Sequence, residues 1–266
     1  MSGPASPPAH DSTQLRPAPL ALADVGAALR FGVNQFRRIP LLSMGFALLF
    51  VAIGALMFAV LEFGEIAPMS LSLAGGFLLV GPILLAGFFS VSDKLRHGRH
   101  ANFGDIWDGF RRMPRGGWVV SFVCGLLFLI WITDAGILYG FMVGREPIGF
   151  LRLLNIESIV VSYAAYSATM GAVLAFILFA VSAFSIPLIY DRRAQLVSGV
   201  VASVRAVFGR FGVVMVWGLS LAAVIMLSVL LLPLLLISLP VMAYASREFY
   251  FRVFPLDAER NRPEPA

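Results

Sequence analysis

The feature that most constrains the fold is a run of 36 consecutive residues without a charged side chain, Phe211–Ser246. A helix needs only about 20 apolar residues to cross a bilayer, so one span would leave much of this run unused. Two spans with a tight turn near Pro233 would need nearly all of it and a few residues beyond Ser246, and two spans are predicted. Further long apolar runs occupy much of the chain. Only 13% of its 266 residues are charged, whereas soluble domains carry roughly 25%. The sequence therefore predicts an all-α, polytopic membrane protein.

Six transmembrane helices are predicted between residues 21 and 254, with a tail on either side. Residues 1–20 are rich in proline and poor in large apolar side chains, so they are predicted to be disordered. Residues 255–266 form the second tail. The predicted spans are Pro40–Leu61, Pro68–Ser90, Gly117–Val143, one helix within Ser158–Tyr190, and two helices within residues 211–254.

The distribution of lysine and arginine favours six spans over five. With six spans, only Arg145 and Arg152 of the 20 Lys and Arg residues lie on the far side of the membrane. With five spans, the four arginines at the C-terminal end would join them. Basic residues concentrate on the cytoplasmic side, so both termini are predicted to be cytoplasmic. Arg247 and Arg252, near the end of the last span, are expected to extend their side chains to the interface.

A short motif precedes two of the spans. FRRIP at residues 36–40 and FRRMP at residues 110–114 match at four of five positions, and VFGRF at residues 207–211 is a blurred third copy. Each ends an amphipathic stretch and begins an apolar run. The pattern predicts three pseudo-repeats, each an interfacial amphipathic helix followed by a transmembrane hairpin. The hinge residues of the two clear copies are Phe36, Arg37, Arg38, Pro40, Phe110, Arg111, Arg112 and Pro114.

The repeat leaves two questions open. The first amphipathic stretch, residues 22–38, could lie in the membrane interface or pack beneath neighbouring spans. Repeats in membrane proteins often place a site where the copies meet, but they also arise by duplication without any site. The fourth span also carries a pattern of small residues, in which Ala164, Ala168 and Ala172 recur every four residues beside Ser167 and Gly171. Such small-residue faces are typical of close helix–helix contacts.

One ionisable residue, Asp134, lies well inside a predicted span. Intramembrane carboxylates often mark ion or proton pathways, so Asp134 with Tyr139 is a candidate polar site. The alternative is that Asp134 is protonated, or that it faces the outer interface with hydrogen bonds to Thr133 or a neighbouring carbonyl. The three histidines lie outside the predicted spans, so haem ligation in a spanning bundle is not expected. We expect no catalytic residues, metal site or cofactor, and no nucleic-acid binding.

Five stretches occur in a characteristic order. They are GGFLLVGPILLAGFFSVSDKL (residues 75–95), IPLIYDRR (186–193), SVRAVF (203–208), MVWG (215–218) and LLPLLLISLPVMAYASREFYFR (231–252). In these stretches the chain resembles a family of predicted bacterial integral membrane proteins catalogued as domain of unknown function 2189, and the resemblance covers roughly residues 30–254. It implies a bacterial inner-membrane protein and adds no activity.

Two functional hypotheses follow from these observations. The first is a non-enzymatic accessory or assembly component of a membrane complex, with the lipid bilayer and other membrane proteins or further copies of itself as partners. The second is a small proton- or cation-coupled transporter or channel-like protein that uses Asp134.

Overall fold

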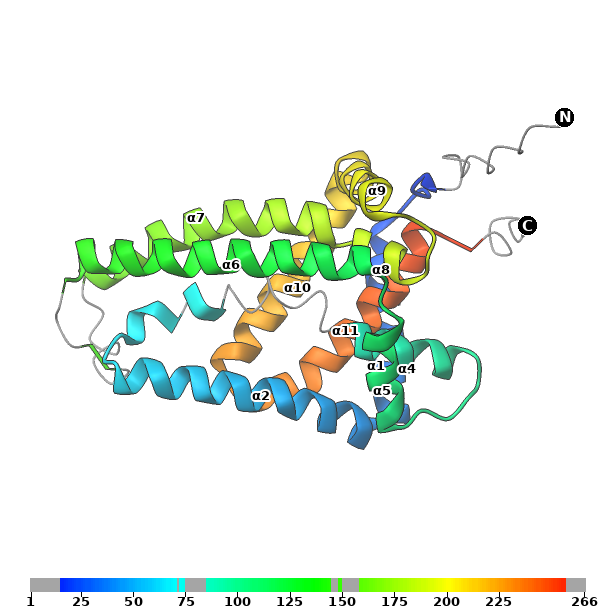
Figure 1. The fold of residues 1–266 in the computed structure, drawn as a ribbon, viewed down its shortest axis with the longest axis horizontal. Helices are drawn as coiled ribbons and strands as arrows, with labels where there is room; N and C mark the ends of the chain where they lie inside the picture. The colour runs from blue at the N-terminus through cyan, green and yellow to red at the C-terminus, as the bar shows by residue number, and fades with distance from the viewer. Residues whose placement is uncertain (1–14, 71, 75–84, 145–147, 150–157, 257–266) are drawn as a thin grey trace, which may run out of the picture.

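The computed structural model describes residues 15–70, 72–74, 85–144, 148–149 and 158–256 (Figure 1). These residues form an all-helical protein with no strand among them, as the sequence predicts. Two segments of 3-10 helix, Ala67–Met69 and Leu232–Leu234, lie beside helices. The helices are α1 (Leu22–Arg38), α2 (Pro40–Phe63), α4 (Ala86–Arg96), α5 (Phe103–Arg112), α6 (Arg115–Met142), α7 (Ser158–Ser182), α8 (Ser185–Tyr190), α9 (Leu196–Gly209), α10 (Phe211–Leu230) and α11 (Leu235–Val253).

Within the described residues, five helical segments are long and apolar enough to cross a membrane. They are Pro40–Phe63, Arg115–Met142, Ser158–Tyr190, Phe211–Leu230 and Leu232–Val253. The predicted span Pro68–Ser90 lies partly outside the described residues, so six spans and three pseudo-repeats are not confirmed. The uncharged run 211–246 does divide into two helices. Pro233 lies in the short turn between them, where a residue without a backbone N–H breaks the helical ladder.

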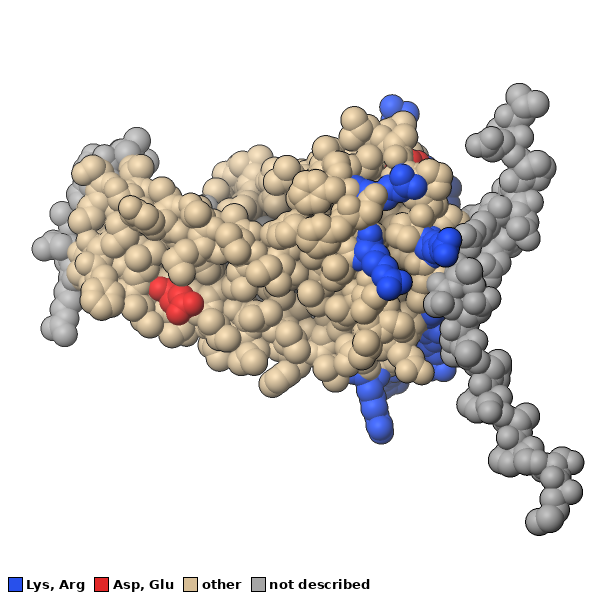
Figure 2. Space-filling view, turned by 90° about the horizontal axis from the view of Figure 1, so that it is seen from above, with Lys and Arg blue, Asp and Glu red and all other residues tan. Residues whose placement is uncertain are grey.

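The helices separate into a spanning bundle and a cluster at one end (Figure 1). Helices α6 and α7 lie side by side, α2 runs along the opposite side, and α10 and α11 cross between them. Helices α1, α4, α5, α8 and α9 gather at the end where α2, α6 and α10 begin. On the face shown in Figure 2, lysine and arginine collect at this same end. We call it the basic end.

Helix α1 packs against α11 rather than lying apart from the bundle. A Cβ added to Gly32 would lie 2.4 Å from the Val241 carbonyl oxygen and 2.9 Å from the Ala245 Cβ. Only a residue without a side chain permits this approach of two backbones. Arg252 of α11 also donates to the Asp24 carboxylate of α1 at 2.9 Å. Of the two placements open at the sequence level, the structure shows the packed one.

The first and third predicted hinges share a local geometry at the break between helices, and the second differs from them. Helix α1 ends at Arg38 and α5 at Arg112, and each spanning helix that follows starts within three residues. The break residue of the first hinge, Ile39, has φ −140° and ψ 58°, and the corresponding Arg210 has φ −129° and ψ 40°. At the second hinge Pro114 precedes α6 as its N-cap. The FRR motifs therefore mark sharp helix–helix corners.

The described part of the predicted N-terminal tail, residues 15–20, lies on the protein. Leu15 and Leu20 pack against the main apolar core, and the Ala18 backbone N–H donates to the Val253 carbonyl at 2.9 Å. Residues 1–14 and 257–266 of the two predicted tails lie outside the described residues.

Candidate functional site

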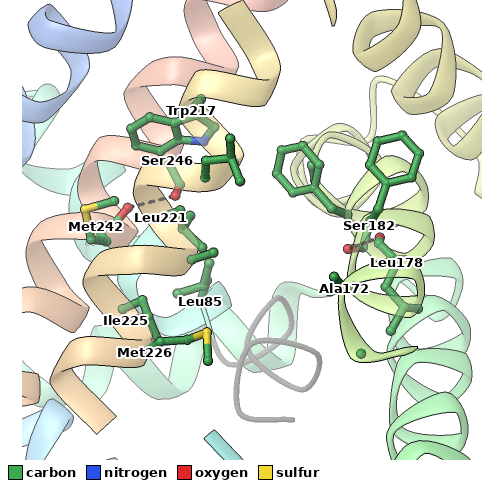
Figure 3. A pocket seen from close by; sticks show the side chains of 18 of the residues that line it. Leu85, Ala172, Leu178, Ser182, Trp217, Leu221, Ile225, Met226, Met242 and Ser246 are labelled. Carbon is green, nitrogen blue, oxygen red and sulfur yellow. Dashed lines mark hydrogen bonds between the residues drawn. The ribbon is translucent and has the colours of Figure 1, made fainter. Parts of the chain in front are cut away.

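A cavity of about 590 Å³ lies between α7 on one side and α10 and α11 on the other (Figure 3). Ala172, Leu178 and Ser182 of α7 face Trp217, Leu221, Ile225 and Met226 of α10, with Met242 and Ser246 of α11 beside them. Leu85 and Phe89 near the start of α4 and Trp131 of α6 complete the described wall. The lining is almost wholly apolar, so the cavity suits an apolar ligand with few polar groups.

The small-residue face of α7 opens onto this cavity. Ser167, Ala168, Gly171 and Ala172 all contribute to the lining. Gly171 makes room for the indole of Trp131, because a Cβ at this position would lie 2.7 Å from the ring. The sequence predicts a close helix–helix contact here. The structure instead uses the small side chains to leave space and to accommodate one large ring.

A group of hydroxyl side chains borders the cavity on the side away from the basic end. The Ser72 Oγ lies 2.7 Å from the Ser167 Oγ and 3.3 Å from the Tyr163 hydroxyl. The Trp131 indole N–H donates to the Ser72 carbonyl at 3.0 Å. A hydroxyl offers one donor and two acceptor sites, so Ser72 and Ser167 retain capacity for one more partner. This hydroxyl group, Ser72, Tyr163 and Ser167, is the polar end of the cavity.

The opposite end of the cavity adjoins a buried ion cluster formed by Arg247, Asp93 and Asp191. The Arg247 side chain is only 2% exposed. Its Nε and Nη2 donate to the two carboxylate oxygens of Asp93 at 3.0 and 2.9 Å, and Nη2 also donates to Asp191 Oδ1 at 2.6 Å. The cluster ties α11 to α4 and to the end of α8.

Aromatic rings enclose this guanidinium. The rings of Phe89, Tyr190, Tyr250 and Phe251 have their centres between 4.6 and 5.4 Å from its central carbon. Phe89 also lines the cavity, so the ion cluster and the cavity share a wall. The expectation that Arg247 reaches the interface is wrong. Its position on α11 faces the packed helices of the basic end, where two carboxylates replace water as its partners.

More ion pairs surround the buried cluster. Glu248 pairs with Arg96 of α4 and with Arg252, whose Nε lies 3.2 Å from it. Lys94 pairs with Asp105, which also accepts from the backbone N–H of Asn102, the N-cap of α5, at 2.8 Å and so completes a capping box. Together these contacts connect α1, α4, α5 and α11.

The pKa values of half-buried Asp93 on α4 and buried Asp105 on α5 are shifted in opposite directions. Burial raises the pKa of Asp93 above its ordinary value, and the charge of Arg247 offsets only part of this effect. Burial also acts to raise the pKa of Asp105, but hydrogen bonds from Lys94 and Asn102 outweigh it and lower that pKa. Asp105 is therefore held in its charged form, whereas Asp93 is charged against the effect of burial.

The structure does not bring Asp134 and Tyr139 together. Asp134 is exposed on the surface of α6. Tyr139 is buried, and its ring makes an edge contact with that of Tyr163 on α7 at 5.4 Å. Five residues along a helix turn the side chain by about 140°, so the two point in different directions. Whether Asp134 carries any activity stays a prediction.

The hinge residues differ in burial. Phe36 and Phe110 pack against the core, whereas Arg37, Arg38, Arg111 and Arg112 are exposed. Pro40 and Pro114 lie at the starts of α2 and α6. The hinges thus point their arginines outward at the basic end.

Sequence reasoning missed the buried ion cluster. Its three members come from three of the stretches that carry the family resemblance, in SVSDKL, IPLIYDRR and AYASREFYFR. Single charges within aromatic-rich segments were the available signal. No group of three potential metal ligands occurs among the described His, Cys, Asp and Glu residues.

Comparisons with known proteins agree with the resemblance. Residues 69–191 match the family model described as predicted integral membrane protein (DUF2189). No curated protein matches the chain, and no solved structure does. The family match contains Asp93, Asp191 and the hydroxyl group at the cavity, and Arg247 lies beyond it.

Proposed function

We propose that this multi-pass membrane protein, whose residues 69–191 belong to the DUF2189 family, is a non-enzymatic accessory component that holds one chain of a lipid-like molecule. The cavity between α7 and α10/α11 is the observation that carries the proposal. It is apolar along most of its length, has the hydrogen-bonded hydroxyl groups of Ser72 and Ser167 at one end, and is lined by small side chains on α7.

The length and lining of the cavity favour a hydrocarbon chain. Its lining on α7 extends from Ser167 to Ser182, about 22 Å at the rise of an α-helix. An almost wholly apolar cavity of this length suits an extended, chain-like ligand with few polar groups.

Selectivity at such a site comes from shape and hydrogen bonding. Lipid tails are already in apolar surroundings, so burial alone offers little driving force inside a bilayer. Close contact with Trp131, Trp217 and the aliphatic wall adds dispersion attraction. Ser72 and Ser167 can bond one polar group on the ligand. We therefore expect a chain-like molecule with one hydrogen-bonding group within the membrane.

The accessory role rests on the outer surfaces of the bundle. In the spanning windows of α2 and α6, only 28% and 22% of residues are buried. These helices leave long apolar faces for lipid or for another membrane protein. A protein that binds a lipid-like molecule and has exposed apolar faces for other membrane proteins could serve as an accessory subunit of a membrane complex.

The cavity is tested by filling it. Ala172→Phe places a ring in the lining, whereas Ala165→Phe adds the same ring to an exposed position of α7 outside the cavity. Both variants and the wild-type protein are extracted from native membranes into lipid discs, and mass spectrometry identifies what co-purifies. We expect one apolar molecule with wild type and Ala165→Phe that is lost with Ala172→Phe. The same molecules in all three samples would refute the cavity as the site.

We further propose that the basic end faces the cytoplasm of a bacterium, with both termini on that side. The support is the outward-pointing arginines at the hinges and the positive-inside rule. Reporter fusions to the C-terminus should be active only in the cytoplasm. A fusion active outside would reverse this orientation.

A second candidate function is coupled transport, which one observation favours. Asp134 is an ionisable side chain exposed among the apolar side chains of α6. Such a residue is expensive to place in lipid and is commonly functional. Asp134→Asn in reconstituted vesicles should abolish a proton or cation flux while the fold is retained. An unchanged flux would remove Asp134 from any transport role.

A further inference from the structure

Two groups stand out among the basic residues at the basic end. Lys94, Arg96, Arg247 and Arg252 form ion pairs with acidic side chains. A second group is exposed and forms no ion pair within the part of the chain that the structure describes. This second group consists of Arg37, Arg38, Arg111, Arg112, Arg115, Arg205 and Arg210. All seven lie at or within six residues of a corner where an amphipathic helix meets a spanning helix.

Large apolar side chains accompany these arginines on the surface. Trp107 and Trp118 flank the second hinge and are 61% and 51% exposed. Phe208 and Phe211 flank the third hinge and are similarly exposed. At the first hinge Leu41 is exposed, and Phe103 of α5 lies against Gly45 one turn further along α2. Exposed tryptophans beside an arginine are more typical of a membrane interface than of a surface that faces only water.

Exposed arginines beside exposed aromatic side chains indicate that the hinges lie among lipid headgroups. Tryptophan and other aromatic side chains concentrate where hydrocarbon gives way to headgroups. An arginine beside them meets phosphate groups, which a guanidinium binds through two parallel hydrogen bonds. Each hinge also starts a spanning helix, whose first backbone N–H groups carry partial positive charge.

We propose that the three hinges form a collar that binds the headgroups of anionic phospholipids. The second hinge is its strongest part, because Arg111, Arg112 and Arg115 lie between Trp107 and Trp118. This collar is separate from the cavity. It lies on the outer surface of the bundle at its basic end and binds headgroups, whereas the cavity holds a chain inside.

The two tryptophans of the second hinge provide a local probe. The chain has four tryptophans, and the other two, Trp131 and Trp217, are buried. The full-length protein is reconstituted twice in phosphatidylcholine with added phosphatidylglycerol. In one sample the phosphatidylcholine is brominated near its headgroup, and in the other the phosphatidylglycerol is. Quenching of tryptophan fluorescence then measures how much each lipid is enriched beside the hinge.

The variant is the triple change Arg111→Gln, Arg112→Gln and Arg115→Gln. Its matched control, Arg30→Gln, Arg99→Gln and Arg192→Gln, removes the same charge from exposed positions away from the corners. An arginine held at the headgroups attracts anionic lipid by a factor of about five, and the attraction falls off away from the membrane surface, where the control arginines are expected to lie. We expect the preference for phosphatidylglycerol to fall by about fivefold or more in the hinge variant and by less than about twofold in the control.

Two results would overturn the proposal. Equal losses in the two triple variants would mean that net charge alone attracts the lipid. No preference in the wild-type protein would mean that no anionic-lipid site exists at this hinge. If the hinge variant fails to fold, Arg111→Gln alone, compared with Arg99→Gln, makes the same test. The wild-type preference must also decrease as salt is raised, because screening weakens exposed charge pairs.

Discussion

Helices α11 and α6 show opposite arrangements of charge and burial. In the spanning window of α11, 56% of residues are buried, and its Arg247 lies inside the protein. In that of α6, 22% are buried, and its Asp134 is exposed. The more polar of the two helices is thus the more buried. In a membrane protein the apolar surface faces the solvent, so hydropathy does not identify the core.

The same contrast separates the two ends of the bundle. At the basic end, ion pairs and aromatic contacts join helices that are distant in sequence, such as α1, α4 and α11. Along α6, the hydroxyl of Thr133 bonds within its own helix. A charge in hydrocarbon needs a partner close by, and the packed end supplies such partners from distant helices.

The largest expected effect is the loss of Arg247. Arg247→Leu leaves Asp93 and Asp191 close together without their shared cation. Breaking a buried pair on one side costs about 3–5 kcal/mol. We expect a loss of that size in the free energy of unfolding, measured by denaturant titration in detergent micelles.

Asp134→Leu is the matched change on α6. It also replaces one charge of a spanning helix by leucine, but at an exposed position, so the free energy of unfolding should stay within about 0.5 kcal/mol of wild type. Similar losses in the two variants would contradict the contrast between the helices. Adding Asp93→Asn and Asp191→Asn to Arg247→Leu should recover part of the lost stability, since neutral groups are less costly to bury.

A second prediction tests how closely α1 packs against α11. Gly32→Ala forces the helices apart, because its Cβ would lie 2.4 Å from the Val241 carbonyl oxygen. We expect a loss of about 1–3 kcal/mol in the free energy of unfolding. Gly26→Ala, on the same helix with nothing within 4 Å, should gain up to about 1 kcal/mol from helix propensity. Equal effects at the two positions would mean that α1 does not pack closely on α11.

The smallest effect concerns Asp105, whose pKa is lowered mainly through Lys94 and Asn102 against the effect of burial. Asp105→Asn should cost about 1 kcal/mol at neutral pH, because it removes the charge that pairs with Lys94 while an amide oxygen can still accept from the Asn102 backbone N–H. The stabilisation is present above the ordinary pKa of about 3.9 and is lost as pH falls through the lower folded pKa. Wild type and variant should therefore differ in thermal midpoint at pH 7 and converge under strong acid. A difference that persists there would exclude the carboxylate charge as its cause.

Local pattern was sufficient for much of the fold. The amphipathic spacing of residues 22–38 matches the bounds of α1, and the predicted turn at Pro233 separates α10 from α11. These features depend on residues a few positions apart, so periodicity and proline chemistry reveal them. The family resemblance was likewise carried by short stretches, and the match over residues 69–191 supports it.

The candidate sites were less predictable. The cavity arises because α7 and α10 stay apart along the small-residue face of α7, and a small-residue face is equally compatible with close contact. Arg247 was expected to reach the interface because charged side chains near helix ends commonly do. Its actual partners lie 154 and 56 residues away in the chain.

The sequence by itself determined that the chain is helical and membrane-embedded, and that one helix ends and the next begins at each FRR motif. These follow from local composition and spacing, which set how each segment meets lipid. Only the tertiary structure decided which arginines are buried and paired and which face outward. Both kinds occur in similar basic, aromatic-rich segments, and the difference lies in whether packing brings a carboxylate from a distant helix within hydrogen-bonding distance.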